Sequence, residues 1–214
     1  MTARHVFVRR AGAWSMQPLF VHQPLLLGVL VASLLIWRGM ETSLDIRSHR
    51  RLRAGAQRQD KGTLAILFVL IALGVALGAL LAFMVPAVAI TSSRAVFFWL
   101  GILLIYTGIA FRLYAIHTLG AYFTTAVAIA PQQTVISAGP YQLIRHPAYT
   151  GFLITLFGYG LCLTNWLSLL VMMGCALIAF IYRIRVEERV LQERLGPPYQ
   201  EYMRRTKRLI PFVL

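Results

Sequence analysis

Residues 148–182 read AYTGFLITLFGYGLCLTNWLSLLVMMGCALIAFIY, a run without Asp, Glu, Lys, Arg or His. As a single α-helix rising 1.5 Å per residue, this run would be about 50 Å long, whereas the hydrocarbon core of a bilayer is about 30 Å thick. Thr164, Asn165 and Trp166 at its midpoint include the polar side chains typical of a turn. We therefore predict a helical hairpin, with one helix over about 148–163 and the second over about 166–182.

Three more apolar stretches lie upstream, at residues 18–37, 63–90 and 95–116, the last interrupted only by Arg112. Each reaches the roughly 20 residues that a transmembrane helix needs, and Pro86 is expected to bend or end the second. Together with the hairpin they predict an all-α, polytopic integral membrane protein with about five transmembrane helices. Four helices, with one long tilted element, is the alternative. We treat residues 1–214 as one membrane domain.

The charges are few and mostly positive. Hydrophobic residues make up 58% of the chain and charged residues 13%, with 21 Lys and Arg against 7 Asp and Glu. A soluble domain carries about 25% charged residues. Seven basic residues fall in 38–62 and eight from Arg183 onward. If successive helices cross the membrane in opposite directions, both segments lie on the same side as loop 117–147. The positive-inside rule makes that side cytoplasmic, with Arg94 and the three arginines of the first ten residues as exceptions.

Attraction to anionic membrane lipids accounts for the basic surplus, so we predict no nucleic-acid partner. The sequence is basic and poor in loops, which favours a bacterial or archaeal cell membrane. The apolar run after Arg9–Arg10 is longer than a typical signal-peptide core, which favours a retained first helix. Whether residues 1–17 lie along the interface is left open.

The cysteines, the histidines and one glycine pattern bear on metal binding and helix packing. Cys162 and Cys175 fit no zinc spacing and the five histidines are scattered, so no metal site is predicted. Gly74 and Gly78 form a G-x-x-x-G pattern, which allows close approach of another helix or internal packing.

Arg112 is the first candidate for a functional side chain. An arginine inside a membrane helix usually faces protein or water and marks a functional site by default. Because Arg112 lies near the end of its helix, snorkelling of its long side chain to the headgroups is the alternative.

The stretch GPYQLIRHPAYTG at 139–151 joins a polar loop to the hairpin. Pro147 suits a first helical position, and Arg145, His146 and Tyr149 fall at the interface. This arrangement fits either an interfacial anchor or a site for an anionic, partly aromatic ligand.

Arg183 and Glu187 form the third candidate, because an i,i+4 spacing places them on one helix face. They make either an ordinary surface ion pair or a partner for a cationic ligand close to the bilayer boundary.

In order, FRLYAIHTLGAYFT (111–124), SAGPYQLIRHPAYTGF (137–152) and YRIRVEERVLQERLGPPYQEYMRRTKRLIPF (182–212) closely resemble the isoprenylcysteine carboxyl methyltransferase (ICMT) family of integral membrane enzymes. The resemblance covers about 108–214 and implies a catalytic methyltransferase core there. Residues 1–107 match only as apolar N-terminal transmembrane helices. Phospholipid methyltransferases share the final core more loosely. The chain has no G-x-G-x-x-G motif, so a Rossmann fold is not expected.

The resemblance implies S-adenosylmethionine as cofactor and assigns roles to particular residues. Cofactor-binding positions are Thr134, Val135, Ile136, Tyr141, His146, Pro147, Ala148, Tyr149 and Glu187. Glu187 matches the acidic residue for the cofactor's cationic end, Arg183 matches a substrate-side arginine, and Arg112 matches the arginine for the acceptor carboxylate. These three are the catalytic candidates. Family members often carry His or Arg near Gln133, so at Gln132–Gln133 only backbone contacts are expected.

The implied reaction is methyl transfer to the carboxylate of a lipophilic, isoprenylcysteine-like acceptor that enters from the bilayer, at a site facing the cytoplasm. A carboxylate is already ionised near pH 7, so orientation and exclusion of water are sufficient and no general base is needed. A phospholipid or a small thiol is the alternative acceptor. A small membrane transporter or a non-catalytic scaffold is the alternative from another functional class.

Overall fold

A computed structural model describes residues 17–53, 57–60, 62–130 and 132–210. Of residues 1–17, whose position at the interface the sequence leaves open, all but Gln17 fall outside these ranges. The long elements are α2 (Pro24–Arg53), α3 (Thr63–Met84), α4 (Arg94–Leu119), α5 (Pro147–Cys162), α6 (Trp166–Leu195) and α7 (Pro197–Arg205). The short elements are the 3₁₀ turns η1 (Leu19–His22), η2 (Pro86–Val88), η3 (Gly120–Tyr122) and η4 (Gly139–Gln142), and the strands β1 (Gln57–Arg58) and β2 (Ala128–Ile129).

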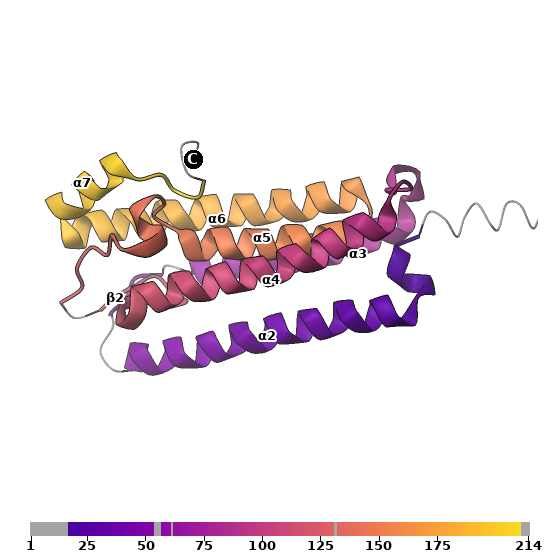
Figure 1. Cartoon of the computed structure of the whole chain (residues 1–214). Helices are drawn as coiled ribbons and strands as arrows, with labels where there is room; N and C mark the ends of the chain where they lie inside the picture. The colour runs from indigo at the N-terminus through magenta and orange to yellow at the C-terminus, as the bar shows by residue number, and fades with distance from the viewer. Residues whose placement is uncertain (1–16, 54–56, 61, 131, 211–214) are drawn as a thin grey trace, which may run out of the picture.

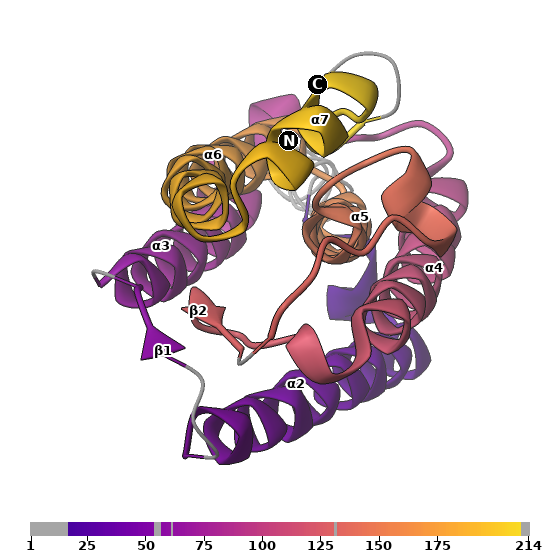
Figure 2. The same cartoon turned by 90° about the vertical axis from the view of Figure 1, so that its left-hand side faces the viewer.

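The five apolar helices run along one common axis, and the chain reverses direction at each connection (Figure 1). Viewed along that axis, α5 lies between α4 and α6, α3 lies beside α6, and α2 lies along α4 (Figure 2). The only strand pairing in the described ranges is the antiparallel pair β1–β2, which lies at one end of the bundle (Figure 1). The fold is therefore the predicted all-α membrane architecture.

The hairpin forms as predicted, because the 148–182 run breaks into two helices. Thr164 adopts a left-handed conformation (φ 49°), and Asn165 caps α6 by accepting the Ser168 N–H at 3.0 Å. The Asn165 amide also donates to the Val85 carbonyl and ties this turn to the end of α3. One long tilted helix in place of the hairpin is therefore wrong.

Four described helices are long and apolar enough to cross a membrane, namely Pro24–Arg50, Thr63–Met84, Arg94–Tyr122 and Trp166–Leu195. The fifth apolar helix, α5, has 16 residues and is about 24 Å long at 1.5 Å per residue. It lies against α4 and α6, where its short length is compatible with burial in protein.

Two helices extend well beyond the predicted apolar stretches. Helix α2 continues from the predicted end at Trp37 to Arg53, and α6 continues from Tyr182 to Leu195. The apolar run marks only the part of a helix that lipid can surround. The helix itself continues until it reaches residues that disfavour helical conformation. For α6 that point is Gly196, which has φ 61° and is followed by proline.

Glycines allow the closest helix contacts. A Cβ at Gly151 of α5 would lie 2.7 Å from the backbone nitrogen of Arg112, and one at Gly108 of α4 would lie 2.4 Å from the Thr155 hydroxyl. Gly74 and Gly78 of α3 meet Cys175 and Met172 of α6 in the same way. The G-x-x-x-G pattern therefore serves internal packing in this chain.

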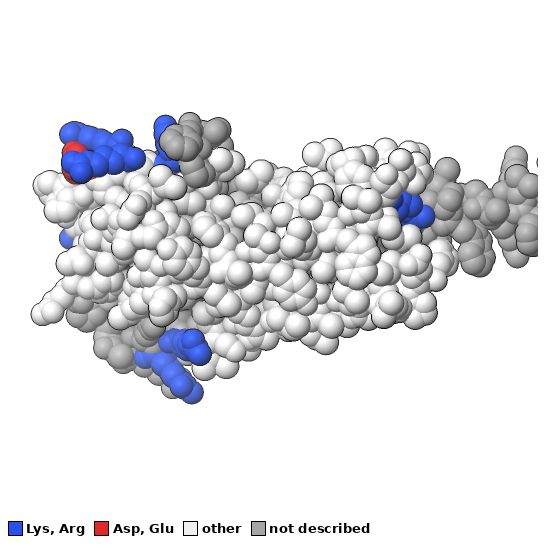
Figure 3. Space-filling model, in the orientation of Figure 1, with Lys and Arg blue, Asp and Glu red and all other residues white. Residues whose placement is uncertain are grey.

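The basic segments gather at one end, as predicted. The β1–β2 pair joins the 38–62 segment to loop 117–147, and a bridge between Ile144 and Lys207 joins that loop to the C-terminal segment. On the face in Figure 3, Lys and Arg cluster at this end and the long middle carries neither. The chain is thus a multi-pass membrane protein with one strongly basic end. The N-terminal arginines and Lys61 lie outside the described residues.

Candidate active site

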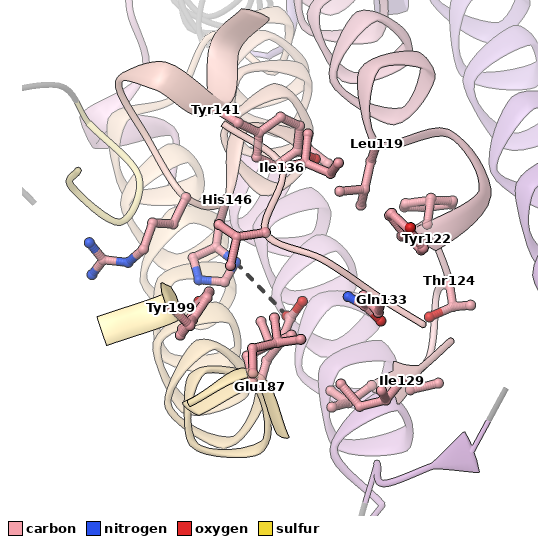
Figure 4. Close-up of a pocket in the computed structure, with 18 of the residues that line it drawn as sticks. Leu119, Tyr122, Thr124, Ile129, Gln133, Ile136, Tyr141, His146, Glu187 and Tyr199 are labelled. Carbon is pink, nitrogen blue, oxygen red and sulfur yellow. Dashed lines mark ion pairs between the residues drawn. The ribbon is translucent and has the colours of Figure 1, made fainter. Parts of the chain in front are cut away.

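A pocket opens at the basic end of the bundle, between loop 120–146 and the ends of α4, α5 and α6 (Figure 4). Its volume is about 850 Å³ with the open mouth included. We call it the loop pocket. It is lined by Leu119, Tyr122, Phe123, Thr124, Ala126, Val127, Ala128, Ile129, Gln133, Thr134, Val135, Ile136, Tyr141, Arg145, His146, Ala148, Tyr149, Glu187, Leu191, Leu195, Tyr199 and Tyr202.

The R-H-P sequence is held at the wall of this pocket by the C-terminal segment. The backbone N–H groups of Arg145 and His146 donate to the carbonyls of Lys207 and Arg208, at 2.7 and 3.0 Å. The Arg145 side chain is paired with the buried Glu188 at 2.8 Å. Pro147 then begins α5, where its missing N–H costs no hydrogen bond. Arg145 is therefore a structural residue of the pocket wall.

Glu187 is the acidic side chain that lines the loop pocket. Its carboxylate accepts a hydrogen bond from the Tyr149 hydroxyl at 2.6 Å and lies 3.9 Å from Nδ1 of His146 (Figure 4). The His146 and Tyr149 rings stack with centroids 5.4 Å apart. The Glu187 side chain is 26% exposed, so its carboxylate is accessible from the pocket.

Tyr149 connects Glu187 to Arg183, because its hydroxyl also accepts from the Arg183 Nε at 2.9 Å. The remaining Arg183 nitrogens donate to the side chains of Asp60 and Thr63 and to the Thr125 carbonyl. Arg183 is thus ion-paired with Asp60. Its predicted interaction with Glu187 is indirect, because Tyr149 lies between the two side chains.

The wall outside the membrane helices adds tyrosine hydroxyls. Burial raises the pKa of Tyr202 to about 12 and raises the pKa of Tyr141 further, so both phenols are neutral near pH 7. Tyr202 donates to the Tyr141 carbonyl at 2.8 Å, which fixes α7 against loop 120–146.

A second cavity, which we call the inner cavity, lies deeper among the helices and has a volume of about 450 Å³. It is lined by Glu41, Asp45, Leu64, Leu67, Phe68, Ile71, Arg112, Phe123, Thr124, Thr125, Tyr149, Phe152, Phe180 and Arg183. Phe123, Thr124 and Tyr149 line both cavities, so the two adjoin at Tyr149.

Arg112 faces the inner cavity and is buried within the protein. It donates to the Ala148 carbonyl at 2.8 Å and pairs with Glu41 of α2 at 2.7 Å. Its side chain is 7% exposed, so snorkelling of Arg112 to the headgroups is wrong.

The residues predicted to bind cofactor mostly come together. Eight of the nine line the loop pocket, and the ninth, Pro147, is buried at the start of α5. Gln133 lines the loop pocket too, with its side-chain oxygen accepting the Ala130 N–H. Arg112 and Arg183 line the inner cavity instead, and they contact this set through hydrogen bonds to Ala148 and Tyr149, respectively.

Three carboxylates were missed from the sequence, namely Glu41, Asp60 and Glu188. Each pairs with an arginine at the site. Their scarcity was an available signal, because the chain has only seven Asp and Glu and an acidic residue beside a membrane segment needs a partner.

Part of the chain is similar to proteins of known family. Residues 99–193 match the model of the isoprenylcysteine carboxyl methyltransferase (ICMT) family. Over this segment, which is less than half of its length, the chain is similar to the ICMT family. The matched segment includes Arg112, the R-H-P sequence and Glu187, and so it contributes residues to both cavities.

Curated ICMT relatives are similar over the same half. Protein-S-isoprenylcysteine O-methyltransferase B of Arabidopsis thaliana is 35% identical over 115 residues, covering 53% of this chain and 58% of the relative. The Saccharomyces cerevisiae protein-S-isoprenylcysteine O-methyltransferase is 36% identical over 116 residues, covering 53% and 48%. The chain therefore spans about half of the length of these relatives.

The structure of a eukaryotic intramembrane Ras methyltransferase, ICMT, is similar in fold. It aligns with a TM-score of 0.52 at 24% identity, covering 68% of this chain and 52% of that one. The helical membrane architecture is thus shared with a solved ICMT structure.

Proposed function

We propose that this protein is an S-adenosylmethionine-dependent methyltransferase that esterifies the carboxylate of a lipophilic, isoprenylcysteine-like acceptor. The observation that carries the proposal is the meeting of two unlike cavities at Tyr149. One opens to the basic end of the bundle, and the other lies among apolar helices and contains Arg112. This suits a reaction between a soluble donor and a membrane-held acceptor.

The loop pocket has the side chains that the cofactor would need. S-adenosylmethionine, when bound, supplies a methyl group on a positively charged sulfur. Glu187 offers a carboxylate for the cationic end, and Tyr141 with Ile136 offers an aromatic and apolar wall for the adenine. The backbone of Thr134 and Val135 supplies polar groups along loop 120–146. The residues present therefore fit this cofactor.

The inner cavity suits the acceptor. Its apolar lining comes from α3 through Leu64, Leu67 and Phe68, which matches a hydrocarbon tail. Arg112 is the proposed partner of the acceptor carboxylate, since a guanidinium fork orients carboxylates well. Because side chains of both α2 and α3 line this cavity, we propose that the acceptor enters between these two helices.

The chain's own contribution to the reaction is orientation. A carboxylate held by Arg112 is ionised and needs no base, so aligning it with the methyl group and excluding water account for the catalysis. Tyr149 lies between the two cavities, held by Arg183. We propose Arg183 as the residue that positions Tyr149 and adds positive charge beside the acceptor. The site would face the cytoplasm, because it lies at the basic end.

The test uses detergent-purified full-length protein, S-adenosylmethionine labelled in its methyl group, and N-acetyl-S-farnesylcysteine as the acceptor. The expected product is a methyl ester, which mild base hydrolyses to volatile labelled methanol. Arg112→Ala is expected to remove most of this turnover while cofactor binding persists. Label found only in base-stable lipid or thioether products would show that the acceptor group is not a carboxylate. Absence of S-adenosylmethionine binding by folded protein would refute methyl transfer itself.

A further inference from the structure

Arg112 already holds a carboxylate supplied by the chain itself. Its Nη2 donates to Oε2 of Glu41 at 2.9 Å, and its Nε lies 2.7 Å from Oε1 of the same side chain. The two side chains are 7% and 13% exposed, so this pair is largely removed from water. Glu41 lies on α2, outside the segment that matches the ICMT family.

Two nitrogens of the Arg112 guanidinium face the two carboxylate oxygens of Glu41, so the ion pair is bidentate. Nε of Arg112 and Oε1 of Glu41 lie only 2.7 Å apart, although the contact is off the line of an ideal hydrogen bond. An acceptor carboxylate would therefore compete with Glu41 for the same edge of the Arg112 guanidinium.

Among the residues that the structure describes, the inner cavity offers an incoming anion no uncompensated cation. Its charged lining side chains are Glu41, Asp45, Arg112 and Arg183, and Arg183 is already paired with Asp60. Two carboxylates on one guanidinium in a site of low dielectric repel each other. An acceptor carboxylate can therefore bind Arg112 fully only when Glu41 leaves it.

We propose that Glu41 is a specificity-determining residue, an internal carboxylate that the acceptor must displace from Arg112. The inference rests on the proposed function of the inner cavity. Displacing Glu41 costs free energy, which burial of a long apolar tail offsets at about 25 cal/mol per Å². Short or water-soluble carboxylates lack that area and are rejected, so Glu41 selects acceptors that come from the bilayer.

The experiment measures binding of N-acetyl-S-farnesylcysteine and of its carboxamide to detergent-purified protein by equilibrium dialysis. Glu41→Gln keeps the size of the side chain but removes the competing charge. The expected result is about tenfold tighter binding of the acid, equivalent to about 1.4 kcal/mol, with binding of the carboxamide changed less than about twofold. The shorter N-acetyl-S-prenylcysteine is expected to gain at least as much as the farnesyl compound.

Three further variants make the outcome specific. Glu41→Asp shortens the side chain by one methylene and so draws the carboxylate away from Arg112. Its affinity for the acid is expected to lie between those of wild type and Glu41→Gln. This variant replaces Glu41→Gln in the test if the latter does not fold. Glu201→Gln removes an exposed carboxylate on α7 and is expected to bind as wild type. Asp45→Asn removes the other carboxylate of the cavity, and a gain equal to that of Glu41→Gln would overturn the proposal, because any loss of negative charge would then suffice.

Weaker or unchanged binding of the acid in folded Glu41→Gln would also overturn it, since Glu41 would then only hold Arg112 in place. Dialysis requires no turnover, so this failure is distinguishable from failure of the proposed reaction. Displacement of Glu41 by an acid that is never methylated would leave the role of Glu41 intact and refute the methyl transfer alone.

Discussion

The carboxylate of Asp60 lies 3.1 Å from the guanidinium of Arg183, which is 123 residues further along the chain. Both side chains are 1% exposed. Asp60 belongs to the connection before α3, whereas Arg183 belongs to the segment 99–193 that matches the ICMT family. The N-terminal half therefore supplies a charged partner to the site, in addition to apolar helices.

Replacing Asp60 by Asn is expected to destabilise the protein, because Arg183 would remain buried without its counter-charge. Breaking a buried ion pair costs about 3–5 kcal/mol, which for a chain of this size lowers the unfolding temperature by about 5–10 °C or more. Thermal unfolding in detergent micelles measures the shift. Asp45→Asn, on α2, serves as the comparison and is expected to shift the midpoint by only a few degrees.

The same pair predicts a pH dependence of stability. Burial alone would raise the pKa of Asp60, but hydrogen bonds from Thr63 and Leu64 and the charge of Arg183 outweigh it and lower the pKa below 3.8. The stabilisation is therefore complete above pH about 4 and is lost as the pH falls through the lowered folded-state pKa. The difference in unfolding temperature between wild type and Asp60→Asn should be constant from pH 7 to 5 and shrink below pH about 4. A difference that persists unchanged to pH 2 would contradict this assignment.

Glu187→Gln is expected to weaken binding of S-adenosylmethionine by about tenfold or more, because the proposed contact to the cationic end of the cofactor loses its charge. Titration calorimetry on purified protein measures the affinity. Glu193→Gln removes an exposed carboxylate from the same helix and should leave it unchanged. If both variants weakened S-adenosylmethionine binding equally, the effect would come from the loss of negative charge in general and not from a contact made by Glu187.

Tyr149→Phe removes the hydroxyl that joins Arg183 to Glu187 while keeping the ring between His146 and Phe180. We expect turnover to fall by about tenfold or more and stability to fall by about 1–3 kcal/mol, since two charged groups each lose a hydrogen bond. Initial rates at saturating cofactor and acceptor measure the first effect. Tyr182→Phe, an exposed tyrosine of α6, should change neither quantity.

Much of the fold follows from the sequence because lipid imposes simple length rules. The break at Thr164–Asn165 was predictable, since an apolar run of that length exceeds one crossing and its centre carries turn chemistry. The extents of α2 and α6 were not predictable, because charged residues past the membrane boundary are themselves good helix formers. Burial in lipid and helix formation are separate requirements.

The site divides in a similar way. His146 and Glu187 were predictable from local motifs, and the structure brings them together in one pocket. The partners of Arg112 and Arg183 were not, because Glu41 and Asp60 meet them across 71 and 123 residues of chain. Local spacing carries no information about such contacts, and only the scarcity of acidic residues pointed to them.

Gly151→Ala is expected to separate α4 from α5 at the point where Arg112 is held. A Cβ at this position would lie 2.7–2.9 Å from the backbone and Cβ of Arg112, so α4 has to move. Overpacking of this kind costs about 1–3 kcal/mol, and it displaces the guanidinium that the acceptor carboxylate is proposed to bind. The KM for the acceptor should therefore rise together with the loss of stability, while affinity for S-adenosylmethionine changes less. Gly174→Ala is the matched control, because a Cβ there meets nothing within 4 Å and alanine favours a helix interior over glycine by up to about 1 kcal/mol. An unfolding temperature for Gly151→Ala equal to that of Gly174→Ala would show that the α4–α5 contact does not require glycine.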